Sequence, residues 1–99
     1  MPYIKNRKDF DSALEPLAAQ IKDVGDLNYV ITRLATRFLL AEGLNYAEIN
    51  AVSGVLQKVA AEFDARVTRP YEDLKIWQNG DIPEYAEISK LIGDSYPVS

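Results

Sequence analysis

Residues 45–67 read NYAEINAVSGVLQKVAAEFDARV, and this stretch does most to decide the fold class. Its apolar residues recur every three or four positions, which is the spacing of one face of an α-helix. The repeating positions are Ile49, Val52, Leu56, Val59 and Phe63, followed by Arg66 or Val67. This stripe covers more than two heptads, so it predicts a long helix suited to antiparallel packing with the preceding helix or with a partner chain.

The residues before this stripe predict where one helix ends and the next begins. Asn45 is placed to cap the long helix, and Glu48 three residues on completes a capping-box arrangement. Gly43 is the expected end of a preceding helix over 26–42, which Asp26 is placed to cap. The inner face of that helix is expected to hold Leu27, Val30 or Ile31, Leu34, Phe38 and Ala41.

A first helix is predicted by an earlier apolar stripe. Its positions are Phe10, Leu14, Leu17, Ile21 and Val24. Because proline is tolerated mainly in the first turn of a helix, Pro16 places the regular start near Glu15, after a looser turn over 9–13. Gly25 is the expected stop.

Pro70 is expected to kink or break the long helix, since it lacks a backbone N–H. Thr68 can cap the continuation over 70–78, where Tyr71, Leu74 and Trp77 or Gln78 share a face. The pair Asn79-Gly80 is expected to end that continuation.

A last short helix is predicted over 83–92, with Gly93 as its stop. Strand signals, in the form of sustained alternation between turns, are almost absent. The sequence therefore predicts an all-α protein: a short N-terminal helix, a long antiparallel helical hairpin with a bent second arm, and a short C-terminal helix. It is expected to be a single helical domain over 1–99, with 1–8 as a flexible arm and 94–99 as a tail.

Composition narrows the function classes. The 99 residues include 47% hydrophobic residues, which suffices for a core, but no apolar run approaches the roughly 18 residues of a membrane span. The net charge of −4 opposes binding of DNA or RNA polymers, which relies on clustered Lys and Arg. No cysteine and no apolar signal region is present, so the cytoplasm is the expected location and no membrane partner is expected.

The stretches GDLNYVITRL (25–34), LNYA (44–47), PYEDLKI (70–76) and NGD (79–81) resemble an uncharacterised family of small proteins found in phages and bacterial genomes. That resemblance implies no established activity and no catalytic residues. The expected architecture is in turn similar to the phage anti-defence sponges, which oligomerise and sequester cyclic-nucleotide alarm signals. This second resemblance implies a homo-oligomer, a nucleotide ligand and, for a phage-encoded protein, the host cytoplasm.

The residue inventory disfavours catalysis. Histidine and cysteine are both missing, which removes the commonest general base, the Ser-His and Cys-His nucleophile pairs and nearly all zinc sites. The close acidic pairs 62/64 and 72/73 do not share a helix face, so solvated surface is the favoured interpretation of both. We therefore expect no enzyme activity, no catalytic residue, no metal and no cofactor.

Tyr29, Arg33 and Arg37 are the first candidate ligand-binding group. They lie four residues apart, so they share one face of the helix expected over 26–42. Such a ladder can stack a base on the ring and pair the guanidinium groups with phosphate. In the commoner arrangement, arginines of this kind lie along a solvated face or pair with acids of a neighbouring helix.

A second basic and aromatic group surrounds Pro70. It consists of Arg66, Arg69, Tyr71 and Lys75. Salt bridges with Glu72 and Asp73, together with helix capping, are the favoured interpretation. In an antiparallel hairpin Arg66 would lie roughly 16 Å along the helix from the level of Arg33, so only an oligomer would bring the two groups together.

Two functions remain in competition. The first is a homo-oligomeric binding module that captures a small anionic nucleotide through Arg and Tyr side chains at subunit junctions. The alternative is a protein-interaction module that inhibits or adapts a host protein, supported by the acidic composition and the long heptad stripe. An enzyme is the least favoured class.

Overall fold

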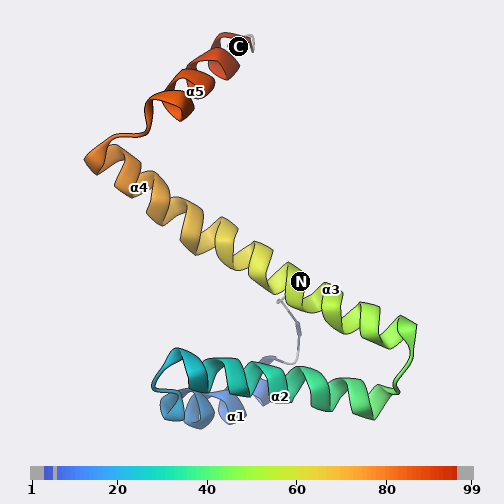
Figure 1. Cartoon of the computed structure of the whole chain (residues 1–99). Helices are drawn as coiled ribbons and strands as arrows, with labels where there is room; N and C mark the ends of the chain where they lie inside the picture. The colour runs from blue at the N-terminus through green and yellow to red at the C-terminus, as the bar shows by residue number, and fades with distance from the viewer. Residues whose placement is uncertain (1–3, 6, 96–99) are drawn as a thin grey trace. The chain divides into compact units, whose positions relative to one another are not determined.

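The structure, a computed structural model, describes residues 4, 5 and 7–95 and consists of consecutive helices (Figure 1). The elements are α1 (Arg7–Gln20), α2 (Val24–Glu42), α3 (Tyr46–Phe63), the π-helical turn η1 (Asp64–Thr68), α4 (Arg69–Asn79) and α5 (Pro83–Ser95). No strand occurs among the described residues, and the all-α class is confirmed.

The chain divides into two units, Met1–Ala60 and Ala61–Ser99. The single domain expected over 1–99 stays a prediction. Of the expected arm and tail, residues 1–3, 6 and 96–99 lie outside the described residues. Where those segments are described they are largely helical, because α1 already begins at Arg7 and α5 continues to Ser95.

α1 contains Pro16 in its interior, so the predicted start near Glu15 was wrong. A proline removes one backbone hydrogen bond and crowds the preceding turn, and the sequence-based argument treated this cost as enough to delay the helix. The helix nevertheless extends over 14 residues on both sides of the proline. The looser turn expected over 9–13 is part of the same helix.

α2 begins one turn earlier than predicted, because Asp23 rather than Asp26 is its N-cap. The Asp23 carboxylate accepts a hydrogen bond from the Asp26 N–H at 2.8 Å, and the Asp26 carboxylate accepts one from the Lys22 N–H at 3.0 Å. These two bonds serve backbone N–H groups that have no partner within the helix. Gly25 therefore lies in the first turn of α2 and does not stop the preceding helix.

The turn between α2 and α3 follows the prediction closely. Gly43 adopts a φ of 120°, and its N–H donates to the Leu39 carbonyl at 2.9 Å, which ends α2. The Asn45 side-chain oxygen then accepts from the Glu48 N–H at 3.0 Å. Both the glycine end and the asparagine cap are confirmed.

Replacing Asn45 with Ala is expected to lower the free energy of unfolding by about 1 kcal/mol, because the Glu48 N–H loses its acceptor. Urea unfolding followed by circular dichroism at one fixed protein concentration measures this. Asn50→Ala, five residues further into α3, serves as the control and should cost less than half as much. Equal effects of the two substitutions would contradict the capping role.

Pro70 does not break the long helix, because a widened turn precedes it. Residues 46–79 are helical throughout, and the Arg69 N–H donates to the Asp64 carbonyl, five residues back instead of four. A π-helical turn of this kind gives the proline ring more room beside the Arg66 carbonyl, which the proline nitrogen cannot serve. Thr68 makes no capping hydrogen bond, so that prediction was wrong; its hydroxyl donates to the Asp64 carboxylate at 2.9 Å.

The predicted C-terminal ends of α4 and α5 differ in their outcome. Gly80 ends α4 with a φ of 85°, and its N–H donates to the Ile76 carbonyl at 2.7 Å, which confirms the expected stop. Gly93 instead lies inside α5. A glycine accepts helical dihedral angles as readily as left-handed ones, so its presence alone does not end a helix.

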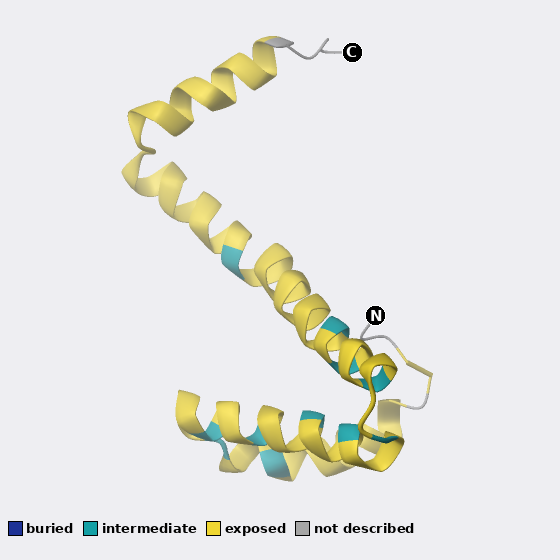
Figure 2. Cartoon of the chain, turned by 45° about the vertical axis from the view of Figure 1, so that its right-hand side comes forward, coloured by how far each residue is buried: buried dark blue, intermediate teal, exposed yellow. Residues whose placement is uncertain are grey.

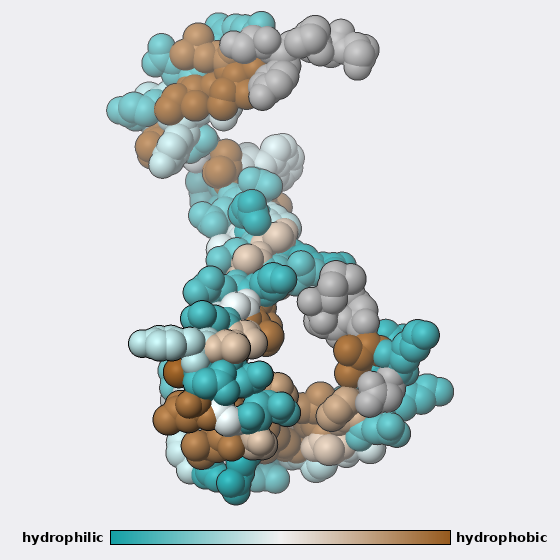
Figure 3. All heavy atoms as spheres, turned by 90° about the vertical axis from the view of Figure 1, so that its right-hand side faces the viewer, coloured by the Kyte–Doolittle hydropathy of each residue, from teal (hydrophilic) through white to brown (hydrophobic). Residues whose placement is uncertain are grey.

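None of the residues that the structure describes is buried (Figure 2). Most apolar positions expected on an inner face are more than a third exposed, from 39% for Ile49 to 60% for Val59, while Val30 and Val52 are half-buried. Apolar side chains lie open on the surface of the N-terminal helices and of α5 (Figure 3). The antiparallel hairpin packing therefore stays a prediction. In the described part of the chain, no helix is both long enough and apolar enough to cross a membrane.

Candidate functional site

The first predicted group lies on the exposed surface of α2. Arg33 Nη1 donates a hydrogen bond to the Tyr29 hydroxyl at 2.9 Å, and Arg33 Cζ lies 5.7 Å from the centre of the Tyr29 ring. Both contacts follow from the four-residue spacing, which stacks side chains on one helix face. The pair is open to solvent, since Tyr29 is 61% exposed.

Arg37 follows one turn after Arg33 on the same helix and is also exposed. Two guanidinium groups at this spacing share one face of α2, and each offers a planar set of N–H donors. The expected Tyr29, Arg33 and Arg37 ladder is therefore present as a surface of one helix. It lies entirely within the unit Met1–Ala60.

The second predicted group lies in the unit Ala61–Ser99, and its members have separate local contacts. Arg66 Nη1 lies 3.3 Å from a carboxylate oxygen of Glu62, in an ion pair whose side chains are 62% and 45% exposed. An exposed pair of this kind contributes about 0–1 kcal/mol, so it holds Arg66 only weakly. Glu72 and Asp73 were the acidic residues expected to form salt bridges with this group. The ion pair with Glu62 was not predicted, although Glu62 lies four residues before Arg66 in the sequence.

Tyr71 is 58% exposed and has a cation beside its ring. The Lys75 ammonium lies 5.5 Å from the ring centre. The two residues are four apart in α4, so they form the same kind of cation–π pair as Tyr29 and Arg33 in α2. Each unit thus contains an aromatic ring with an adjacent cation among its described residues.

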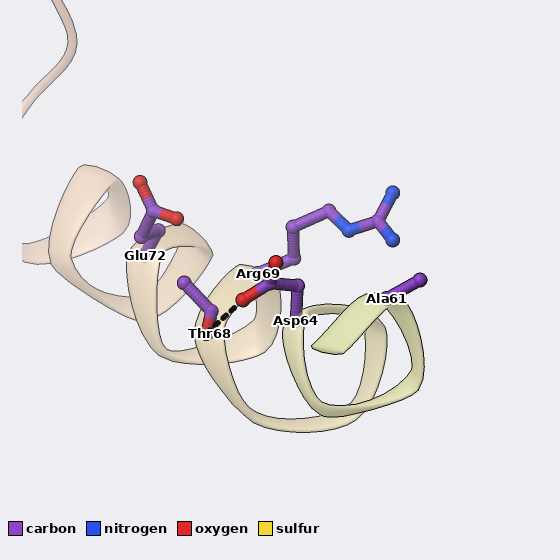
Figure 4. Close-up of a pocket in the computed structure, with 5 residues that line it drawn as sticks. All are labelled: Ala61, Asp64, Thr68, Arg69 and Glu72. Atoms are coloured by element: carbon purple, nitrogen blue, oxygen red, sulfur yellow. Dashed lines mark hydrogen bonds between the residues drawn. The ribbon is translucent and has the colours of Figure 1, made fainter. Parts of the chain in front are cut away.

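Arg69 borders an open hollow on the surface of η1 and α4 (Figure 4). The hollow is lined by Ala61, Asp64, Thr68, Arg69 and Glu72. Its two carboxylates outnumber its one guanidinium, which disfavours an anionic ligand held by these residues alone. Figure 4 shows the Arg69 side chain extended away from Glu72.

The arrangement suits charge-assisted recognition. Among the described residues, no three His, Cys, Asp or Glu side chains gather in a way that holds a metal ion. The chemical capacity of both groups lies in guanidinium donors and open aromatic rings. Such groups bind phosphate and stack on bases.

A family model described as a domain of unknown function (DUF6899) matches residues 1–82. The chain belongs to the DUF6899 family. No curated protein and no solved structure matches the chain.

All six predicted binding residues lie inside the segment that matches DUF6899. They are Tyr29, Arg33, Arg37, Arg66, Arg69 and Tyr71. α5 begins at Pro83, directly after the match ends. The candidate site therefore belongs to the DUF6899 segment, and α5 follows it as an additional helix.

Proposed function

We propose that this DUF6899 protein is a non-enzymatic, homo-oligomeric binding protein that captures a small anionic nucleotide. A cyclic nucleotide or a related immune signal is the most specific ligand class that the proposal names. The observation that carries it is the Tyr29 and Arg33 pair on α2, joined by a 2.9 Å hydrogen bond and followed one turn later by Arg37. The resemblance to small phage and bacterial proteins supports the same setting.

The Tyr29 and Arg33 pair has the chemistry that a nucleotide requires. The Tyr29 hydroxyl accepts a bond from one of the five guanidinium N–H groups, which holds the side chain in place and leaves the other donors for a phosphate. The Tyr29 ring offers a stacking surface for a base. Arg37 supplies a second charge at the distance of one helical turn.

Oligomerisation is part of the proposal because an exposed arginine on a single helix binds anions weakly. Water screens its charge, whereas a subunit junction removes water and strengthens each charge-assisted bond. The exposed apolar side chains of every helix give the chain a reason to assemble. In such an assembly the second group, Arg66, Arg69 and Tyr71, is proposed to meet the first group of another copy.

The alternative function is a protein-interaction module that inhibits or adapts a host protein. The same exposed apolar side chains favour it, since a surface of this kind fits a protein partner as well as a second copy. In that function the arginines would pair with carboxylates of the partner. The two functions differ in whether the isolated protein assembles and binds nucleotides.

The test is calorimetry of the intact protein against a panel of cyclic dinucleotides and related nucleotide signals, alongside a native mass measurement. We expect a mass that is a multiple of 11.1 kDa at micromolar concentration, and saturable heat with at least one nucleotide. Inorganic phosphate is the control ligand and should bind far more weakly. A monomeric mass with no heat from any nucleotide would favour the protein-interaction module.

A further inference from the structure

We infer that one half of the surface of α2 selects a guanine nucleotide over an adenine nucleotide. This inference rests on the proposed function and adds which base the ligand carries. The observations that carry it are the residue types that this half of the helix presents and the directions of the hydrogen bonds among its side chains.

Over residues 27–38, α2 separates into two halves of different chemistry. At about 3.6 residues per turn, the residues with a polar group all fall within one half of the helix circumference, and the remaining positions are all apolar. We call the first set the polar half of α2. It consists of Asn28, Tyr29, Thr32, Arg33, Thr36 and Arg37. All six residues are exposed, and all lie within the unit Met1–Ala60.

The polar half of α2 carries two cations and no carboxylate. The chain contains 15 acidic residues, but none of them lies between Asp26 and Glu42. Among the residues that the structure describes, neither Arg33 nor Arg37 forms an ion pair, whereas the second predicted group contains one. The two guanidinium groups of α2 therefore keep their donors for a ligand that is anionic or rich in acceptors.

Hydrogen bonds within the polar half of α2 engage its acceptors. The Tyr29 hydroxyl accepts from Arg33 at 2.9 Å. The Asn28 side-chain oxygen accepts from the Thr32 hydroxyl at 3.3 Å, and the two amide N–H groups of Asn28 remain for a ligand. The Thr36 hydroxyl donates to the Thr32 backbone carbonyl at 2.7 Å, so it is directed at the helix backbone. The polar half therefore offers a ligand mainly donors.

A surface of donors distinguishes guanine from adenine. Guanine carries two neighbouring acceptors on one edge, N7 and O6, and a guanidinium group binds both at once. On the same edge adenine carries one acceptor, N7, beside the N6 amine, which is itself a donor. The amide of an asparagine suits that edge of adenine, because it offers an oxygen and an N–H group together. The Asn28 oxygen is engaged by Thr32, which disfavours this pairing.

The two arginines divide the ligand between them. In the proposed function the Tyr29 ring stacks the base, so one guanidinium group binds the N7 and O6 edge and the other binds a phosphate. Arg33 and Arg37 stand one turn apart, roughly 6 Å along the helix axis, so both parts of one nucleotide are bound by a single helix. Cytosine also carries two neighbouring acceptors, but its single ring offers less surface for stacking on Tyr29.

The first test is calorimetry of the intact protein with nucleotides that differ only in the base. Cyclic di-GMP and cyclic di-AMP carry the same phosphates, as do cyclic GMP and cyclic AMP. We expect the guanine member of at least one pair to bind at least about tenfold more tightly than the adenine member. The inosine counterpart keeps N7 and O6 and should bind within about threefold of guanine. The 7-deazaguanine counterpart lacks N7 and should lose the preference, and the cytosine counterpart should bind more weakly than guanine.

The second test follows the ratio of guanine to adenine affinity in two threonine variants. Thr32→Val removes the hydroxyl that donates to Asn28, which frees the Asn28 oxygen to accept from the N6 amine of adenine. We expect the ratio to fall at least about threefold. Thr36→Val is the matched control, because it removes a hydroxyl that donates to a backbone carbonyl instead. It should leave the ratio unchanged.

The arginines are tested by the same ratio. Of Arg33→Ala and Arg37→Ala, the variant that loses the contact to the base should bring the ratio close to one. The variant that loses the contact to the phosphate should weaken guanine and adenine ligands alike. Arg7→Ala, which removes a charge from α1, is the control and should change neither affinity. Circular dichroism checks that each variant keeps its helices.

The outcomes separate this inference from the proposed function. A protein that binds no nucleotide overturns both. A protein that binds nucleotides, but holds adenine or cytosine ligands as tightly as guanine ligands, overturns the choice of base alone. An inosine ligand that binds as weakly as adenine overturns N7 and O6 as the edge that is bound. A guanine preference that survives in both arginine variants, or that does not respond to Thr32→Val, overturns the polar half of α2 as its source.

Discussion

Replacing Leu56 with Asp is expected to lower the free energy of unfolding by several kcal/mol and to leave the chain largely unfolded. Leu56 stands in the middle of the heptad stripe and is 42% exposed in the single chain, so its remaining apolar surface is available to a packed partner. The substitution loses the burial of a leucine, about 1.5–3 kcal/mol, and adds the cost of desolvating a carboxylate. A small domain has a total stability of only about 5–15 kcal/mol.

The measurement is urea unfolding followed by circular dichroism at a fixed protein concentration. Gln57→Asp is the matched control, because it introduces the same side chain one residue later, off the stripe. Gln57 is exposed and makes only a 3.2 Å hydrogen bond to Ser53, so its replacement should cost less than about 1 kcal/mol. A Leu56→Asp protein with the unfolding midpoint of the control would show that the packed face of α3 is a different one.

Replacing Arg33 with Ala is expected to weaken nucleotide binding about ten- to a hundred-fold. One charge-assisted contact in a water-excluded site contributes about 1.5–3 kcal/mol, and a factor of ten corresponds to 1.4 kcal/mol. The same change at all four candidate positions should abolish tight binding; these are Arg33, Arg37, Arg66 and Arg69. Because these side chains are exposed, the helical circular-dichroism signal should not change.

Three further substitutions sharpen this prediction. Arg7→Ala removes the same charge from α1, outside the candidate groups, and should leave the affinity unchanged. Arg33→Lys keeps the charge but loses the planar fork, so it should recover only part of the affinity. Tyr29→Phe keeps the ring and removes the hydroxyl that accepts from Arg33, and should cost less than Arg33→Ala. Binding that survives all four alanine substitutions would place the site elsewhere.

The sequence predicted those features of the fold that depend on a few neighbouring residues. Gly43, Asn45 and Gly80 each act through a contact within five residues, and all three were predicted correctly. The errors occur where one residue's preference opposes the continuation of a helix. Pro16 and Gly93 are both enclosed by helix, because extending an existing helix is more favourable than ending it and starting another.

The same distinction applies to the candidate site: a contact between near neighbours could be predicted, whereas packing between helices could not. The contact between Tyr29 and Arg33 follows from a spacing of four residues, and the structure contains it. The π-helical turn η1 was not predicted, because its signal is a one-residue shift in the apolar pattern that looks like a choice between Arg66 and Val67. How the first group lies relative to the second depends on packing between helices, and helical periodicity does not determine that.

Under the proposed function, the exposure of the apolar side chains in the described part of the chain has a consequence for protein abundance. A chain whose apolar side chains find cover only on a second copy folds and associates in one step, so its stability rises with its own concentration. At low expression most copies would be unfolded and open to proteases, and at high expression most would be protected. Under the proposed function, the cell would accumulate the binding protein only once synthesis passes a threshold.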